Sequence, residues 1–202
     1  MMISLRYIII IIPITFLGFL VGPSCKNTPS DANDTADSTN TQVDYIKLGD
    51  SITYVAQVEL INVLLKAMEA NGTEGAVSFC NTNALGIMDI LSEKFDCKIS
   101  RISDKYRNPA DKLQGATDNM AWQVLLKQGS DKKAFTMKKN DQTVFYTPIV
   151  IGANFCLKCH GDPQKDIEPG TLAKIKELYP GDLATGYKYG DLRGAWKVEF
   201  KK

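Results

Sequence analysis

The chain has 202 residues, of which 44% are hydrophobic, and it carries five cysteines, one histidine and a formal net charge of +1 at pH 7. This length allows one or two domains, and the hydrophobic content is sufficient for a folded core. A net charge so close to zero, without a basic cluster, argues against nucleic acid or an anionic membrane surface as a partner.

The first 25 residues have the pattern of a secretory signal peptide. Arg6 precedes an apolar run over residues 8–21, and small residues follow up to Cys25. The run is shorter than the roughly 20 residues that a transmembrane helix needs. The position of Cys25 predicts lipoprotein processing, in which its thiol is acylated; a plain signal peptide and an uncleaved anchor are the alternatives. All three place the domain outside the cytoplasmic membrane. With lipoprotein processing as the expected one, we predict a periplasmic or outer-envelope location and a lipid anchor at Cys25.

Residues 26–44 contain mainly Ser, Thr, Asn, Asp and Pro. Such a segment buries too little apolar surface to offset the entropy lost on ordering, so we predict a disordered tether. The alternative is an irregular stretch without a role. The folded domain is then predicted to occupy residues 45–202.

Two helices are predicted at the start of this domain. Apolar residues recur with a period near 3.6 up to residue 70, and Asn71-Gly72 has the composition of a helix C-cap. A second helix follows, with Cys80 on its apolar face. Because residues 81–83 are weak helix formers, we expect this helix to break just after Cys80.

Shorter elements follow in the remainder of the chain. They are a strand over residues 97–103, a turn at Asn108-Pro109, a helix over 116–128, a hairpin of strands 134–138 and 143–151, a helix over 171–178 and a final strand over 195–200. The helices precede most of the strands, which predicts an α+β fold with an antiparallel sheet in one domain.

The stretch after the hairpin contains Cys156, Cys159 and His160 in the order Cys-x-x-Cys-His. This is the attachment motif for c-type haem, in which two thiols add across the porphyrin vinyl groups and the imidazole binds the iron. A thioredoxin-like redox pair, a zinc knuckle and a structural disulfide are the alternatives. Zinc would need two further ligands, and the chain has no second histidine to supply one. We therefore predict one covalently attached haem c.

The residues leave the second axial ligand of the iron open. Ligation by two histidines of one chain is excluded, since His160 is the only histidine. The candidates are water, an open position, a lysine, a tyrosine, Met68, Met88, Met120, Met137, Cys80 and Cys97. Methionine would raise the reduction potential, whereas a thiolate would donate charge to the iron and lower it. For Cys80 the alternatives are a buried inert thiol and a disulfide with Cys97.

Short blocks elsewhere in the chain accompany the motif: Ala76-Val77 with Phe79-Cys80-Asn81, Arg107-Asn108-Pro109, Tyr179-Pro180, and Ala184-Thr185-Gly186-Tyr187 leading to Gly190-Asp191-Leu192-Arg193-Gly194-Ala195. With the motif, they resemble a bacterial family of single-haem c-type cytochromes, whose domain also forms the extracytoplasmic part of some sensor kinases. The resemblance covers residues 50–200. It implies a PAS-like fold, with long N-terminal helices packed against the antiparallel sheet, and it implies His160 and Cys80 as the axial ligands.

Haem propionates are carboxylates, which arginine binds bidentately. The candidate cations are Arg101, Arg107, Arg193 and Lys158. Arg107 and Arg193 lie in the blocks that match the family, so we predict them as the propionate partners, with solvated surface arginines as the alternative.

Two functions fit these predictions. A haem with Cys/His ligation can lose its thiolate on reduction or on binding NO or CO, which favours redox or gas sensing with the signal passed to a separate partner. The alternative is a low-potential electron-transfer cytochrome c. Peroxidase-like catalysis would need a distal acid or base, for which no second histidine is available. We therefore expect no enzymatic activity; the sequence does not identify the redox or signalling partner.

Overall fold

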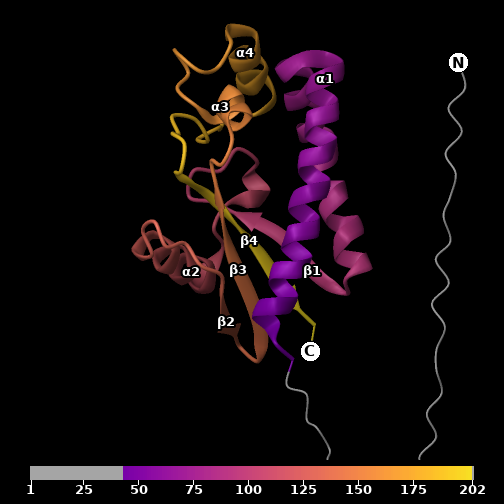
Figure 1. Ribbon diagram of the computed structural model, residues 1–202, viewed down its shortest axis with the longest axis vertical. Helices are drawn as coiled ribbons and strands as arrows, with labels where there is room; N and C mark the ends of the chain where they lie inside the picture. Colours follow the sequence, from indigo (N-terminus) through magenta and orange to yellow (C-terminus); the bar gives the residue numbers. More distant parts are fainter. Residues whose placement is uncertain (1–42, 202) are drawn as a thin grey trace, which may run out of the picture. The chain divides into compact units, whose positions relative to one another are not determined.

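The computed structural model describes residues 43–201, which belong to one unit spanning Thr41–Lys202. In chain order the elements are α1 (Tyr45–Lys94), β1 (Cys97–Ile102), the short 3-10 helix η1 (Pro109–Asp111), α2 (Gly115–Lys127), β2 (Phe135–Lys139), β3 (Gln142–Val150), α3 (Asn154–His160), α4 (Pro169–Leu178) and β4 (Leu192–Phe200) (Figure 1). The predicted α+β class is confirmed. The signal sequence, Cys25 and residues 26–42 of the predicted tether lie outside the described residues.

Helix α1 consists of two halves that meet at Asn71 and Gly72. The side chain of Asp44 caps its first turn by accepting from the backbone N–H groups of residues 46 and 47, at 3.1 Å each. Asn71 leaves helical geometry at φ −138°, and Gly72 takes φ +67°, which favours glycine. The sequence prediction of two helices divided at this dipeptide is therefore confirmed.

The predicted break just after Cys80 is wrong, because α1 continues through this region to Lys94. The hydroxyl of Thr82 donates to the carbonyl oxygen of Ser78 at 3.3 Å, and the side-chain amide of Asn83 donates to that of Phe79 at 3.1 Å. These weak helix formers thus satisfy their side chains on the preceding turn without leaving the helix.

The strands form one antiparallel sheet in the order β1-β4-β3-β2. The first and last strands are therefore neighbours, and the predicted hairpin β2–β3 continues the sheet on the other side of β4. Val198 marks the middle, since it pairs with Ile99 of β1 and with Phe145 of β3. The register between β3 and β4 shifts between Ile149 and Val150, close to where the chain turns towards α3.

The two faces of the sheet carry separate apolar clusters, because side chains alternate along each strand. The face towards α1 buries Ile52, Ala56, Met88, Leu91, Cys97, Ile99, Phe145, Trp196, Val198 and Phe200. The face towards α2 buries Ile102, Ala121, Trp122, Leu125, Val144, Tyr146 and Ala195. Both halves of α1 contribute to the first cluster, so the helical hairpin packs as a unit on that face.

Polar side chains on the α2 face are also buried and are satisfied by one another. Asp118 of α2 accepts a hydrogen bond from the Tyr146 hydroxyl at 2.9 Å and lies 2.9 Å from the ammonium nitrogen of Lys197. Burial of these groups is tolerated because each has a partner.

Helices α3 and α4 lie at the end of the sheet where the two halves of α1 meet (Figure 1). Val77 of α1 packs there with Ile167, Ile175 and Tyr179. This arrangement brings the Cys-x-x-Cys-His motif of α3 opposite the second half of α1. Among residues 43–201, no helix combines the length and apolar character needed to cross a membrane.

Candidate functional site

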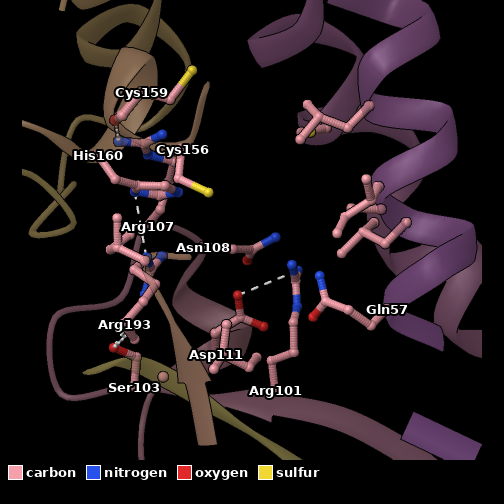
Figure 2. A pocket seen from close by; sticks show the side chains of 18 of the residues that line it. Gln57, Arg101, Ser103, Arg107, Asn108, Asp111, Cys156, Cys159, His160 and Arg193 are labelled. Carbon is pink, nitrogen blue, oxygen red and sulfur yellow. Dashed lines mark hydrogen bonds and ion pairs between the residues drawn. The ribbon is translucent and has the colours of Figure 1, made fainter. Parts of the chain in front are cut away.

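A cavity of about 230 Å³ separates α1 from α3 and the adjoining ends of the strands. Its α1 wall is mainly apolar and includes Leu60, Ile61, Leu64, Met68, Ala76, Val77, Cys80 and Ala84. The opposite wall includes Cys156, Cys159 and His160, and polar side chains from β1 and η1 line one end (Figure 2). An apolar cavity with a few grouped polar side chains is typical of a small-molecule or cofactor site.

The motif occupies the last turn of α3. Figure 2 shows the thiols of Cys156 and Cys159 directed towards the cavity. The helix ends at Gly161, whose N–H donates to the carbonyl oxygen of Leu157 at 2.8 Å. A Cβ at position 161 would lie 2.6 Å from Asp166 and 2.7 Å from that carbonyl oxygen. Glycine is therefore required directly after His160 by the close approach of the chain.

Three successive backbone carbonyls of the motif accept hydrogen bonds from elsewhere in the fold. A guanidinium nitrogen of Arg107 donates to Cys159 O at 2.7 Å, Tyr187 N donates to His160 O at 2.9 Å, and Gly186 N donates to Gly161 O at 2.8 Å. The segment 184–187 thus holds the end of α3 in place. This gives a physical role to a block that sequence analysis identified only through a resemblance.

The imidazole of His160 is fixed in one tautomer. Its Nδ1 lies 2.7 Å from the carbonyl oxygen of Ala184, which can only accept, so Nδ1 carries the hydrogen. The Nε of Arg193 is 3.3 Å from the same Nδ1; both nitrogens are donors in this tautomer, so we assign the shorter contact as the hydrogen bond. Nε2 is left with its lone pair, as in histidines that bind metals.

The electrostatic surroundings keep this imidazole neutral. Burial lowers the pKa of His160 well below its ordinary value, and the positive charges of Arg193 and Arg107 lower it further. The hydrogen bond to Ala184 acts in the opposite direction but does not outweigh them. The ring of Tyr187 meets the imidazole edge-on, with centroids 6.3 Å apart. The side chain is thus presented in the unprotonated form that a metal requires.

Cys80 lies on the α1 wall of the same cavity, as a free thiol that is partly buried. Burial raises the pKa of the Cys80 thiol, and the charges of Arg101 and Arg107 partly offset this rise. Cys97 is buried in the α1-facing cluster and does not line the cavity. It is also a free thiol, so no disulfide joins these two cysteines in the described structure.

The other candidates for the second axial ligand differ in whether they line the cavity. Met68 and Tyr179 line the cavity, whereas Met88 is buried in the α1-facing cluster. Met120 is half exposed, and Met137 packs beside the cluster that faces α2. The structure therefore brings Cys80, Met68 and Tyr179 into the cavity that His160 lines.

The two arginines predicted as propionate partners line the cavity, but protein groups already bind their guanidinium groups. Arg107 donates to both carboxylate oxygens of Asp182, at 3.0 and 3.2 Å. Arg193 donates to the Ser103 hydroxyl at 3.2 Å and to the Lys105 carbonyl oxygen at 3.3 Å. Lys158 is exposed and does not line the cavity.

Sequence reasoning missed two groups that shape the site. The Asp182 carboxylate holds Arg107, and the Ala184 carbonyl oxygen sets the His160 tautomer. Neither has a sequence signal of its own, since one is an ordinary acidic residue in a loop and the other is a backbone atom. The sequence identified Arg101 only as one of four candidate cations for the propionates. Its position on the α1-facing side of the sheet follows from the alternation of side chains along β1, because Cys97 and Ile99 lie on that side.

Comparison with known proteins gave one family and one solved structure. The profile of the Tll0287-like family matches residues 26–200. No significant match was found among curated proteins. The chain is similar to the crystal structure of the cyanobacterial heme-protein Tll0287, with 23% identity, a TM-score of 0.58, and coverage of 79% of this chain and 98% of that one. At this identity the structural likeness supports the fold.

Proposed function

We propose that this chain, which belongs to the Tll0287-like family, holds one haem c in the cavity between α1 and α3. Cys156 and Cys159 would supply the two thioether bonds, and Nε2 of His160 would bind the iron. One observation carries the proposal: the Nδ1–Ala184 hydrogen bond leaves Nε2 available beside two free thiols on the same helical turn. The solved relative is described as a heme-protein, which supports it further.

Cys80 is the proposed second axial ligand. It comes from α1 and lines the same cavity as His160, so the two side chains could approach the iron from different elements. Burial raises the pKa of the Cys80 thiol, and the charges of Arg101 and Arg107 oppose this rise without outweighing it. The thiolate is the form that would bind the iron. A thiolate ligand stabilises ferric iron and lowers the reduction potential. Met68 is the competing ligand, and it would have the opposite effect on the potential.

Redox or gas sensing is the function that such a site supports best. Cys80 belongs to α1, whereas the motif belongs to α3, so loss of the thiolate on reduction or on binding of NO or CO would release a link between two elements. The sheet order, with the first strand β1 beside the last strand β4, supports a PAS-like domain. Such a domain fits a sensing role by analogy. The proposed setting is outside the cytoplasmic membrane, with a lipid anchor at Cys25, no enzymatic turnover and a separate signalling partner.

Low-potential electron transfer is the second candidate. It is favoured by the partial exposure of Cys156 and Cys159, with the exposed Lys158 between them on α3. A redox partner that docks on this helix would come close to the thioether edge of the cofactor.

Electron paramagnetic resonance of the purified ferric protein tests the ligand set. We expect a low-spin signal typical of thiolate ligation, lost in Cys80→Ala together with a rise in reduction potential. Cys97→Ala is the matched control, since it removes a buried thiol that does not line the cavity. An unchanged spectrum and potential in Cys80→Ala would eliminate Cys80 as the ligand. Ready CO binding by the reduced wild type would favour sensing, and a stable six-coordinate reduced state would favour electron transfer.

A further inference from the structure

We propose that Arg101, with Gln57 and Asn108, forms the site for the propionate carboxylates of the haem. The inference rests on the proposed function, because it concerns how the same cavity binds the acidic edge of that cofactor. All three side chains line the cavity, and they come from different elements: β1, the first half of α1, and the residue that precedes η1.

The guanidinium of Arg101 is largely buried and incompletely bonded. Its side chain is 23% exposed, and its ion pair with Asp111 is a loose contact of 3.5 Å between Nη2 and the carboxylate. Within residues 43–201, the buried Nε of Arg101 has no hydrogen-bond partner. A buried donor without a partner is unfavourable, so this nitrogen points to an acceptor that the protein itself does not supply.

The two amides beside Arg101 present donors as well. Oε1 of Gln57 accepts from the indole N–H of Trp196 at 2.9 Å, and Oδ1 of Asn108 accepts from the backbone N–H of Ala110 at 3.0 Å. With both oxygens engaged, the NH₂ groups are the free ends of these amides. Figure 2 shows the amides of Gln57 and Asn108 on either side of the Arg101 guanidinium in this view. One cation and two amide donors that line one cavity match a carboxylate.

The substituent pattern of haem c would place its propionates towards this end of the cavity. In haem c the two thioether-bearing pyrroles lie on one edge of the ring, and the two propionate-bearing pyrroles lie on the opposite edge. Attachment to Cys156 and Cys159 would therefore turn the acidic edge away from α3. Figure 2 shows Cys159 and Arg101 at opposite ends of the view.

Arg107 and Arg193 are less suited to this role. Their guanidinium groups already bind Asp182, Ser103 and backbone carbonyls around the motif. These contacts fix both guanidinium groups against the motif and its neighbouring loops, whereas the buried Nε of Arg101 has no partner within residues 43–201. Buried carboxylates need such a partner, and arginine provides a bidentate one.

The test uses the full-length haem-loaded protein. In Arg101→Gln we expect the propionate bending modes in the resonance Raman spectrum to shift and the reduction potential to fall, because a positive charge near the cofactor is lost. Arg101→Lys keeps the charge without the planar fork, so we expect a Raman shift with a potential near that of wild type. Lys98→Gln removes an exposed cation from the same strand and should change neither readout.

Wild-type propionate modes in both Arg101 variants would overturn the inference. A fall in potential without a Raman shift would also overturn the inference, because Arg101 would then act on the cofactor only through its charge and without contact with the propionates. If Arg101→Gln does not accumulate as folded protein, the Raman spectrum of Arg101→Lys decides alone. Failure of the proposed function looks different, since the wild type would then carry no covalent haem and give no haem Raman spectrum at all.

Discussion

Replacement of Arg107 by alanine should be among the most destabilising single changes in this domain. Its side chain is 11% exposed and that of Asp182 is 9% exposed, and the two form a bidentate ion pair at 3.0 and 3.2 Å. Arg107 also donates to the carbonyl oxygens of Cys159 and Ala184, at 2.7 and 3.4 Å. Removal of the guanidinium leaves a buried carboxylate without its cation and removes a contact that fixes the end of α3.

Loss of one partner from a buried ion pair lowers the free energy of unfolding by about 3–5 kcal/mol. The exposed pair Lys174–Glu177, with side chains 30% and 61% exposed, provides the contrast. Lys174→Ala should lower the free energy of unfolding by less than about 1 kcal/mol, because solvent screens that pair.

Urea denaturation of the full chain, with the slope against urea compared between variants, measures both changes. The double variant Arg107→Ala/Asp182→Ala should lose less than the sum of the two single variants, because it leaves no unpaired buried charge. A loss from Arg107→Ala no larger than that from Lys174→Ala would refute this reasoning.

Two further predictions concern pH dependence and the end of α3. Burial raises the pKa of Glu199, but the hydrogen bond from Lys139 and the charges of Lys197 and Lys139 outweigh it and bring the pKa below its ordinary value of 4.5. The stabilisation from ionised Glu199 is therefore complete above about pH 4.5 and is lost as the pH falls through the lowered pKa. Between about pH 5 and 3, the unfolding free energy of Glu199→Gln should vary less with pH than that of the wild type. Equal pH slopes for the two proteins would contradict this. Gly161→Ala, whose Cβ would lie 2.7 Å from a backbone oxygen of the preceding turn, should lower the unfolding free energy by about 1–3 kcal/mol in urea denaturation. Gly181→Ala, with open space around the new Cβ, should have little effect, and equal losses in the two variants would exclude the steric cause.

Local sequence signals predicted the elements well where the physical cause is local. Asn71-Gly72 divides α1 because Gly72 adopts a positive φ, and the alternation of residues 195–200 matches the two faces of β4. The break expected after Cys80 failed because propensity ignores the hydrogen bonds that Thr82 and Asn83 make to the preceding turn.

The arrangement of the site depends on contacts between distant segments, which sequence patterns do not encode. The motif itself is evident in the sequence, but the His160 tautomer depends on the Ala184 carbonyl oxygen, 24 positions further along the chain. The choice among the arginines likewise depends on which guanidinium groups are already bonded. Family blocks pointed to Arg107 and Arg193, whose guanidinium groups bind protein groups around the motif, whereas Arg101 has a buried Nε without a partner within residues 43–201. Only the three-dimensional arrangement distinguishes a cation that holds the protein together from one that is available to a ligand.

The central claim is that Cys156 and Cys159 attach one haem covalently. Intact mass spectrometry of the denatured, purified full chain, matured in cells that carry the attachment machinery, tests it most directly. We predict the mass of the polypeptide plus one haem, retained in Cys97→Ala and absent from Cys156→Ala/Cys159→Ala. A wild-type mass equal to that of the processed polypeptide alone, or covalent haem that persists in the double variant, would contradict the account.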